Sequence, residues 1–418
     1  MKRKINSLPL ILLFFFAGLL DYYVFSGLKI VTANLPESRE IIHVGYWAIS
    51  AAILSFFVYM LSRIFASQKF NLIFNISFNS FITVFVSKLV FAFLLLSQDV
   101  FRLFLGVINT ISTENGGIPN RSALFIQMAL VASAVPFLSF LFGVTLGKYH
   151  YKVRKATLFF EDLPDAFDGF KIVQISDIHS GSFNDIKSVQ KGINLINAQN
   201  PDMLAFTGDL VNNKASEILP YINLFKQIEA PHGKFSVLGN HDYGDYVNWD
   251  NAEDKRINLI KLKGYHADIG FRLLLDEHQK VEIGNSELSI LGVENWGKGF
   301  GERGDLKKAM KEVDTSGFKI LLSHDPSHWD AQVKNNEIKI HLTLSGHTHG
   351  MQFGIEIGRF KWSPAKYRYP NWAGLAEENG RYLYVNRGFG FLGFAGRVGI
   401  WPEITLIELK KGKIKGFI

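Results

Sequence analysis

Five short clusters of Asp, Asn and His residues in the second half of this 418-residue sequence have the composition of metal ligands. Each cluster follows a short apolar run, and glycine accompanies several of them. Because the chain has no cysteine, any metal must be held by imidazole and oxygen ligands. Such ligands suit Mn, Fe or Zn and do not choose among them. The clusters contain Asp177 and His179; Asp209 and Asn212; Asn240, His241 and Asp242; His324; and His347 and His349.

The spacing within two of the clusters suggests how their side chains converge. In an extended backbone, residues two apart point the same way, so we expect Asp177 with His179, and His347 with His349, to converge at the end of a strand. A glycine beside Asp209 allows the tight backbone that brings a short side chain up to an ion. A single pair of this kind is usually a helix cap or a surface feature. Five clusters in order, each after a strand-like run, are not explained in that way.

The clusters lie at the ends of predicted β-strands. Continuous apolar runs are typical of strands buried on both faces, and segments with helical spacing alternate with them, which indicates an α/β layered domain. Because ligands collect at the carboxyl ends of strands in such sheets, we expect the clusters to meet in one cleft. The predicted strands are 171–176, 202–207, 234–238, 287–293, 318–323, 338–345, 381–385 and 403–409, and the predicted helices are 186–199, 215–228, 255–262 and 306–313.

The first third of the chain is dense in apolar residues and predicts four membrane-spanning helices, at residues 8–28, 42–65, 72–96 and 124–147. Each stretch reaches the roughly 20 residues that cross a bilayer. We expect the first to be a retained span rather than a signal peptide, because no small-residue cleavage site is evident and further apolar stretches follow. The sequence therefore predicts an integral membrane protein with a transmembrane domain at 1–149 and a second domain at 150–418.

Basic residues beside the predicted spans indicate their orientation. Residues 2–4, Arg63, Lys69 and the basic residues of 148–155 all fall on one side, so the positive-inside rule places both termini and the second domain in the cytoplasm. These residues would also give the formal net charge of +7, which is therefore weak information about partners. Within the apolar stretches, Asp21 and Lys88 mark either a polar pathway or a pair that faces the inside of the bundle.

Taken together, the clusters resemble the signature of the calcineurin-like metallophosphoesterase superfamily, most closely its bacterial membrane-associated branch. The signature is Asp-x-His, Gly-Asp, Gly-Asn-His, His and Gly-His-x-His, and it is matched at 177–179, 208–209, 239–241, 324 and 346–349. The resemblance covers nearly all of residues 150–418. It implies a four-layer α/β/β/α sandwich, here preceded by a bundle of about four transmembrane helices, with a centre for two divalent metal ions.

The resemblance also implies a role for each matched residue. One metal would be held by Asp177, His179 and His349, the other by Asn240, His324 and His347, with Asp209 bridging the two. Hydroxide held between two metal ions would attack phosphorus while the metals neutralise phosphate oxygens. His241 would be the catalytic group, stabilising the phosphoryl charge or protonating the leaving oxygen.

One position departs from the family pattern. Several members carry an Asp three residues after the bridging Asp, where it orients the catalytic histidine, and here that position is Asn212. An Asn side chain can accept a hydrogen bond from His241 but lacks the charge that favours imidazolium. Asp242 is the alternative partner.

The predicted function is that of a membrane-anchored, metal-dependent phosphoesterase acting on a phosphomonoester, phosphodiester or pyrophosphate, and the membrane location suggests a lipid-linked substrate. The alternative is a transport or signalling module in which the spans are the working part and the metal domain binds a phosphorylated ligand without turnover. No nucleotide-binding glycine loop occurs in a strand-to-helix context, and no basic helix or recognition motif indicates a nucleic-acid partner.

Two further features leave alternatives open. The segment 351–372 mixes aromatic and basic residues, as would a lid at the membrane interface, a cradle for an anionic substrate, or a packed surface loop. Arg387 could contact phosphate or pair with a nearby acid. The remaining histidines of the second half lack a matching motif, and we expect them to be structural or exposed: His232, His266, His278, His328 and His341.

Overall fold

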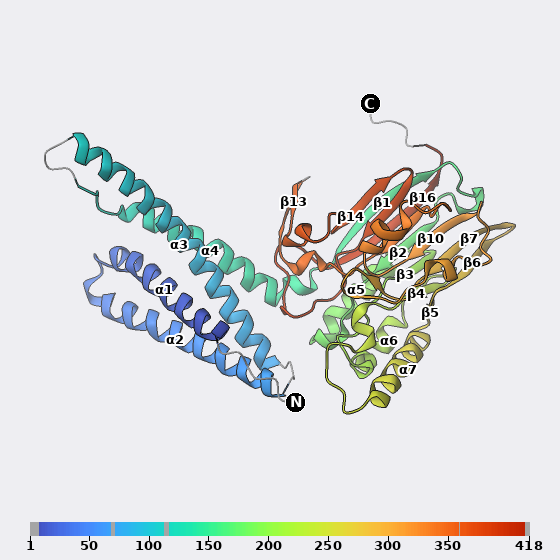
Figure 1. Ribbon diagram of the computed structural model, residues 1–418, viewed down its shortest axis with the longest axis horizontal. Helices are drawn as coiled ribbons and strands as arrows, with labels where there is room; N and C mark the ends of the chain where they lie inside the picture. The colour runs from blue at the N-terminus through green and yellow to red at the C-terminus, as the bar shows by residue number, and fades with distance from the viewer. Residues whose placement is uncertain (1–7, 68–71, 113–116, 359, 414–418) are drawn as a thin grey trace. The chain divides into compact units, whose positions relative to one another are not determined.

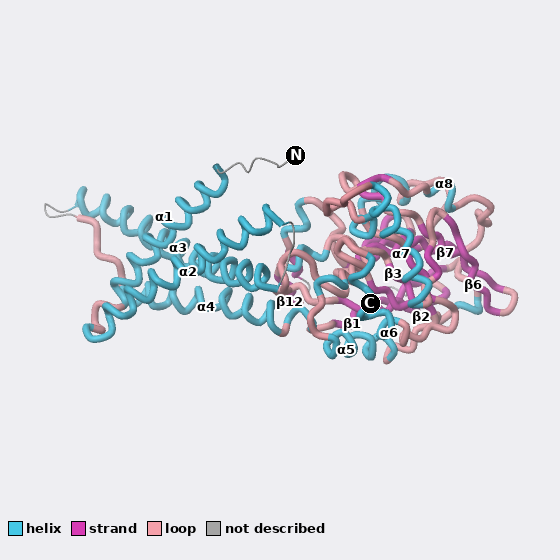
Figure 2. The backbone as a smooth tube through the Cα atoms, turned by 90° about the horizontal axis from the view of Figure 1, so that it is seen from below, coloured by secondary structure: helices cyan, strands magenta, loops and turns pink. Residues whose placement is uncertain are grey.

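The computed structural model describes residues 8–67, 72–112, 117–358 and 360–413. Within these residues the chain forms two compact units that divide between Val144 and Thr145. Figure 2 shows that the first unit is built of helices and that the described strands all lie in the second. Residues 2–4 and Lys69, which contributed to the predicted orientation, lie outside the described residues.

The first unit contains four long apolar helices, which confirms the four predicted spans. They are α1 (Leu8–Val31), α2 (Pro36–Ser67), α3 (Leu72–Ser112) and α4 (Ala123–Thr145), and each is long and apolar enough to cross a membrane. Helix α3 continues well beyond its predicted end at residue 96. Its later charges do not stop it, because Asp99 pairs with Arg102 one turn on, 2.6 Å away, and with Arg121 near the start of α4.

Asp21 of α1 and Lys88 of α3 form an ion pair inside the first unit. The Lys88 Nζ donates to the Asp21 carboxylate at 2.5 Å and to the Ser50 hydroxyl of α2 at 2.8 Å. The Tyr46 hydroxyl of α2 donates to the same carboxylate at 2.7 Å. This is the bundle-facing pair of the two alternatives, and it joins three helices by groups that would be costly to expose to lipid.

The second unit contains two six-stranded sheets. The first has the order β1-β16-β2-β3-β4-β5 and the second β14-β15-β11-β10-β7-β6. Neighbouring strands from β2 to β5 are parallel, as are β7, β10, β11 and β15. The bounds are β1 Lys152–Phe160, β2 Lys171–Ile175, β3 Met203–Phe206, β4 Lys234–Ser236, β5 Arg272–Leu273, β6 Glu277–Ile283, β7 Ser286–Gly292, β10 Phe318–Leu322, β11 Leu342–Ser345, β14 Gly374–Glu378, β15 Arg381–Val385 and β16 Glu403–Lys411.

Alternating residues of the central strands enter different cores, and this produces four layers (Figure 1). Ile172 of the first sheet and Ile320 of the second share the core between the sheets. Val173, one position along, packs with the helices on the outer face of the first sheet. Those helices are α5 (Ile186–Asn197), α6 (Ile222–Phe225) and α7 (Ala252–Ile269), while α8 (Leu306–Ala309) and a π turn at Trp329–Val333 cover the second sheet. The predicted α/β/β/α sandwich is confirmed.

The eight predicted strands are all present, and the strands that sequence reasoning missed lie at edges or in small hairpins. β1, β5, β6 and β14 are outer or next-to-outer strands whose exposed polar residues interrupt any apolar run. Two short antiparallel pairs complete the unit. They are β8 (Trp296–Gly297) with β9 (Gly301–Glu302), and β12 (Ile355–Ile357) with β13 (Phe360–Trp362).

The Asp21–Lys88 pair predicts that removal of Lys88 alone destabilises the first unit and that removal of both charges restores most of the stability. Lys88→Met should lower the midpoint of thermal unfolding in detergent, because it leaves a carboxylate inside the bundle without its cation, at a cost of about 3–5 kcal/mol for a buried pair. The double variant Asp21→Asn/Lys88→Met should recover most of the loss. Circular dichroism at a helix wavelength measures it. Lys29→Met, at an exposed lysine of α1, is the control, and a double variant no better than Lys88→Met would contradict the pairing.

A second stability prediction concerns His266 on α7, which is fully buried and accepts or donates one hydrogen bond with the Ser236 hydroxyl at 2.9 Å. Burial lowers the pKa of His266 to about 3. The unfolded chain, with a histidine pKa of about 6.5, therefore binds a proton first as the pH falls. The stability that neutral His266 contributes is complete above about pH 6.5 and is lost progressively towards pH 3, by up to roughly 1.4 kcal/mol per pH unit.

The measurement is urea unfolding of the full chain from pH 7 to pH 4, followed by tryptophan fluorescence, since six of the seven tryptophans lie in the second unit. The free-energy difference between the wild type and His266→Gln should shrink as the pH falls. The partly buried His232 provides the control substitution to Gln. A difference that stays constant with pH would contradict the assignment.

Candidate metal centre

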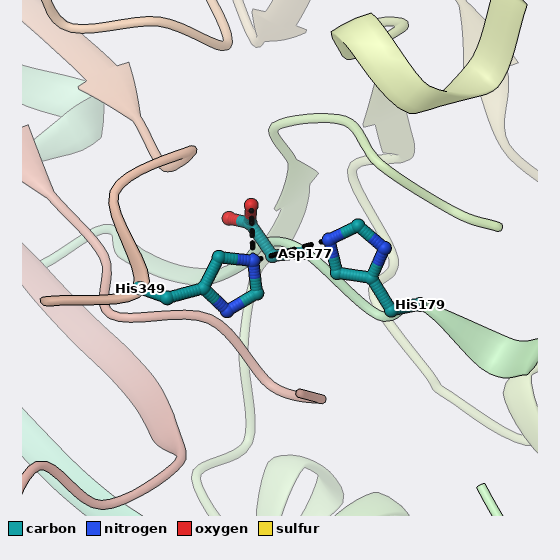
Figure 3. Close-up of side chains that lie close together, drawn as sticks. All are labelled: Asp177, His179 and His349. Carbon is teal, nitrogen blue, oxygen red and sulfur yellow. Dashed lines mark hydrogen bonds and ion pairs between the residues drawn. The ribbon is translucent and has the colours of Figure 1, made fainter. Parts of the chain in front are cut away.

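Two groups of His and Asp side chains converge at the carboxyl ends of the central strands. The first consists of Asp177, His179 and His349, and the second of Asp209, His324 and His347; within each group the possible ligand atoms lie within 4.8 Å of one another. Figure 3 shows the two imidazoles and the carboxylate of the first group turned towards one another. The Nε2 atoms of His179 and His349 are 3.1 Å apart, and the His349 Nε2 is 3.2 Å from a carboxylate oxygen of Asp177.

Asp209 lies between the two groups. One of its carboxylate oxygens is 3.4 Å from the His179 Nε2 of the first group and 3.3 Å from the His324 Nε2 of the second. The His324 Nε2 is in turn 3.1 Å from the amide oxygen of Asn240 and 3.2 Å from the His347 Nδ1. The structure therefore brings all seven predicted ligand residues into one continuous cluster.

The predicted extended backbone of these residues is wrong. Asp177, His179, Asp209, His347 and His349 have φ values of 50°, 47°, 60°, 69° and 50°, in the left-handed region that residues other than glycine rarely adopt. His347 and His349 belong to different groups of the cluster, as the resemblance implied. Sharp turns just past the strand ends, rather than alternation along a strand, aim these side chains. Backbone strain of this kind collects at functional sites.

A glycine-rich segment holds the first of these turns in place. The backbone N–H of Phe389 donates to the backbone carbonyl oxygen of Ser176 at 2.7 Å, and that of Gly390 donates to the backbone carbonyl oxygen of Asp177 at 2.9 Å. A Cβ on Gly390 would lie 1.9 Å from the Ile178 carbonyl oxygen, so only glycine permits this approach. Sequence analysis missed this clamp, since its contacts join segments more than 200 residues apart.

Asp242 supports the bridging residue. Its carboxylate accepts the backbone N–H groups of Asp209 at 2.9 Å, Leu210 at 2.8 Å and Gly239 at 2.9 Å. Burial, together with the nearby Asp209 carboxylate, raises the pKa of Asp242 to about 7. Asp242 thus shapes the loop that carries Asp209, and its hydrogen bonds do not involve the His241 ring.

The His241 ring is oriented by the backbone of Asn212. Its Nδ1 is 2.8 Å from the Asn212 carbonyl oxygen, while the Asn212 side chain bonds instead to the Ser182 hydroxyl. The backbone N–H of His241 donates to the Asp209 carboxylate at 2.8 Å, and its ring lies against the rings of His179 and Tyr246. The expected side-chain contact of Asn212 is replaced by a carbonyl, which accepts a hydrogen bond equally well.

Hydrogen bonds on the outer side of the second group decide which ring nitrogens face inward. The His324 Nδ1 is 2.7 Å from the Thr207 carbonyl oxygen, which can only accept, so its Nε2 remains available as a ligand. The His347 Nε2 contacts the Tyr369 hydroxyl at 2.9 Å and the Asp325 carboxylate at 3.3 Å, so the Nδ1 of His347 remains available as a ligand. Sequence analysis missed Asp325 and Tyr369, although the position of Asp325 directly after a predicted ligand was an available signal.

The protonation states of the cluster fit cation binding. Burial lowers the pKa of His179 well below its usual value and that of His347 to about 4, so both imidazoles are neutral at pH 7. Burial opposes ionisation of Asp209, but the neighbouring imidazole of His324 holds the pKa of that carboxyl well below its usual range. Although burial lowers the pKa of His324, the Asp209 carboxylate raises it to about 10. The buried cluster thus favours positive charge, which a divalent metal ion would supply in place of that proton.

Arg387 and the other histidines have structural partners. The Arg387 guanidinium donates to Glu403 and to Glu356, each at 2.6 Å, and its side chain is only 3% exposed. Of the two alternatives, pairing with an acid is therefore correct. Among the described residues, the groups able to hold a metal include none of the remaining histidines that sequence analysis set aside. His341, for example, accepts the backbone N–H of Lys319 and contacts Asp162.

Comparison with known proteins agrees with this fold. Residues 170–351 match the family described as Calcineurin-like phosphoesterase, and residues 5–148 match the one described as Probable Calcineurin-like phosphoesterase, transmembrane domain. The chain is 31% identical to the uncharacterized metallophosphoesterase YkuE of Bacillus subtilis, over 59% of this chain and 82% of that protein. An uncharacterized metallophosphoesterase of Aquifex aeolicus is 32% identical over 63% of this chain and 94% of that protein.

A third relative extends the similarity to both units. An uncharacterized metallophosphoesterase of Helicobacter pylori is 24% identical over 94% of this chain and 95% of that protein. The chain belongs to the calcineurin-like metallophosphoesterase family, and within it to proteins that carry a four-helix transmembrane domain.

The contacts of His347 predict that Asp325 strengthens metal binding without being a ligand. Asp325→Ala removes a carboxylate that orients the imidazole, and such partners typically contribute 10- to 100-fold to metal affinity. Titration of the metal-free full chain with Mn²⁺, followed by calorimetry, should show weaker binding in this range. Asp330→Ala, which removes a surface carboxylate paired with Lys334, is the matched control. Equal affinities for the two variants would contradict the role.

Proposed function

We propose that this protein is a membrane-anchored phosphoesterase that uses two divalent metal ions to hydrolyse a phosphomonoester, phosphodiester or pyrophosphate. The observation that supports it most is the placement of Asp209, whose carboxylate lies within 3.4 Å of one imidazole from each ligand group. A carboxylate shared in this way suits a pair of cations better than a single one. Mn, Fe and Zn all suit these oxygen and imidazole donors.

Each residue of the cluster has a role in this proposal. Asp177, His179 and His349 would hold one metal, and Asn240, His324 and His347 would hold the other, with Asp209 as the ligand residue that lies between the two groups. When bound, two divalent cations supply Lewis-acid chemistry, by lowering the pKa of a water molecule and by neutralising phosphate oxygens. The chain itself fixes the geometry through the left-handed turns and through the Asp242 and Asp325 carboxylates.

His241 is the catalytic group of the proposal. Its Nδ1–H donates to the Asn212 carbonyl oxygen, which fixes the ring and assigns the Nε2 to the substrate. With a proton on the Nε2 as well, in the imidazolium form, it would stabilise charge on the phosphoryl group or protonate the leaving oxygen.

The membrane unit narrows the proposed substrate and location. Four spans place both ends of the chain on the same side, and basic residues such as Arg63 and Lys148 flank that side, so we assign the second unit to the cytoplasm. A catalytic unit attached to a bilayer meets membrane-bound phosphates at high local concentration. A lipid-linked phosphoester is therefore the proposed substrate class.

The test compares metal content and turnover in the same variants. Full-length protein in detergent, with added Mn²⁺, is assayed on p-nitrophenyl phosphate and bis(p-nitrophenyl) phosphate. Asp209→Ala should lose metal and activity together, whereas His241→Ala should keep its metal and lose about 10²-fold or more in kcat, the usual contribution of a positioned proton donor. Elemental analysis measures the metal, and His232→Ala is the control.

Two results would overturn the proposal. Stoichiometric metal with no turnover of either substrate would favour a module that binds a phosphorylated ligand without hydrolysing it. Equal loss of metal from the Asp209 and His241 variants would make His241 a ligand or a structural residue instead of the catalytic group.

A further inference from the structure

The β12–β13 hairpin turns its apolar face away from the protein. Its register pairs Ile355 with Trp362 and Ile357 with Phe360, so these four side chains share one face, while Glu356 shares the other face with Lys361. Ile357 is 73% exposed, Phe360 62% and Ile355 47%. An antiparallel pair that packs on a core ordinarily buries its apolar face. Here three of the four apolar side chains are exposed and Trp362 is half-buried, while on the other face Glu356 is half-buried and Lys361 is exposed.

Hydrogen bonds and ion pairs on the inner face hold the hairpin in this orientation. Glu356 pairs with Arg154 of β1 and accepts from Arg387 at 2.6 Å. On the adjacent strand, the Lys361 ammonium donates to the Ala373 carbonyl oxygen at 2.6 Å. Arg387 is nearly fully buried, so turning the hairpin over would leave a buried guanidinium without one of its carboxylates. The apolar face is therefore fixed outward.

Two apolar residues that flank the hairpin in the sequence are also exposed. Met351 is 52% exposed and Tyr367 is 77% exposed, and the exposed Lys366 lies next to Tyr367. Aliphatic and aromatic side chains with lysines at their margin match the composition of surfaces that enter the headgroup region of a bilayer. We define the docking face as the three exposed apolar residues that the hairpin register puts on one face, Ile355, Ile357 and Phe360.

We propose that this docking face inserts into the headgroup region of the membrane that the first unit spans. The covalent chain supports a bilayer as the occupant. Thr145 ends α4, Arg154 follows nine positions later, and Arg154 pairs with Glu356 of the hairpin. Nine residues reach at most about 32 Å when fully extended. The Arg154 backbone therefore stays within that reach of the end of the last span, and the hairpin base lies one side-chain ion pair beyond it.

Docking would also bear on the metal centre, because the hairpin begins six residues after His349 and is fastened to the same loop. The Ser363 hydroxyl, just after β13, donates to the Gly350 carbonyl oxygen at 2.6 Å. A surface that enters the bilayer at this point would bring the metal loop close to phosphates in the headgroup layer. The docking inference itself rests on the hairpin and the chain length, and it holds whether or not the site is catalytic.

The experiment uses the absence of native cysteine, which makes a single introduced thiol unique. Ile357→Cys and Phe360→Cys report from the docking face. Ile260→Cys is the matched control, an isoleucine on α7 that is 52% exposed. Each full-length variant is labelled with bimane and placed in nanodiscs of phosphatidylcholine and phosphatidylglycerol. Some nanodiscs also contain a lipid with a nitroxide near the headgroup end of its acyl chain.

We expect the nitroxide lipid to quench bimane at 357 and 360 at least about twofold more than at 260, as for side chains that enter the interface. Quenching no greater than at 260, with full access to iodide in the water phase, would overturn the proposal. The proposal would also be overturned if bimane at 357 were shielded from iodide only in nanodiscs with two protein copies and were not quenched by the nitroxide lipid. A second copy would then be the occupant of the docking face. Loss of lipid quenching in Glu356→Ala, with the label at 357, would further support the anchoring ion pairs.

Discussion

The position of the Asp209 carboxylate is the constraint on which the second unit depends. It must lie among imidazoles that follow strands of both sheets, His179 after β2 of the first and His324 after β10 of the second, so both sheets have to end at the same place. The Asp242 carboxylate accepts hydrogen bonds from backbone N–H groups of the loop that carries Asp209. A Cβ on Gly239 would lie only 2.2 Å from an oxygen of the Asp209 carboxylate. The short strands β3 and β4, together with the glycine after each, are consequences of this close approach.

Charge balance explains why this arrangement needs a cation. Asp177 and Asp209 are fully or almost fully buried, and burial alone would favour their neutral forms. Both nevertheless have a pKa below the usual range, because imidazoles of the cluster surround them. A buried cluster of this kind is stable only if positive charge is present, either as protons on histidine or as bound metal. Neutral His179 and His347 leave their lone pairs for the metal.

The sequence predicted most of the fold and the convergence of the seven candidate ligand residues, for a physical reason. Strands buried on both faces require continuous apolar runs, and the candidate ligands stand directly after those runs, so both are visible locally. The left-handed turns were not predictable, because Asp177 and His349 adopt them only against segments far along the chain. Tyr369 escaped for the same reason, and so did the role of Asp242, which was considered as a partner of His241 and supports the Asp209 loop instead. Their partners are brought together by the fold, and no pattern of spacing marks them.

The β12–β13 hairpin shows where alternation alone misleads. Ile355 and Ile357 flank Glu356, a pattern that by itself would bury the isoleucines and expose the carboxylate. The buried Arg387 guanidinium explains why Glu356 points inward instead. It is held near the metal loops by Glu403, and its second carboxylate must come from the hairpin. Because a shift of one residue moves every side chain of a strand to the opposite face, satisfying one buried guanidinium turns the whole apolar face outward. A membrane protein can tolerate that exposure where a soluble one would risk aggregation.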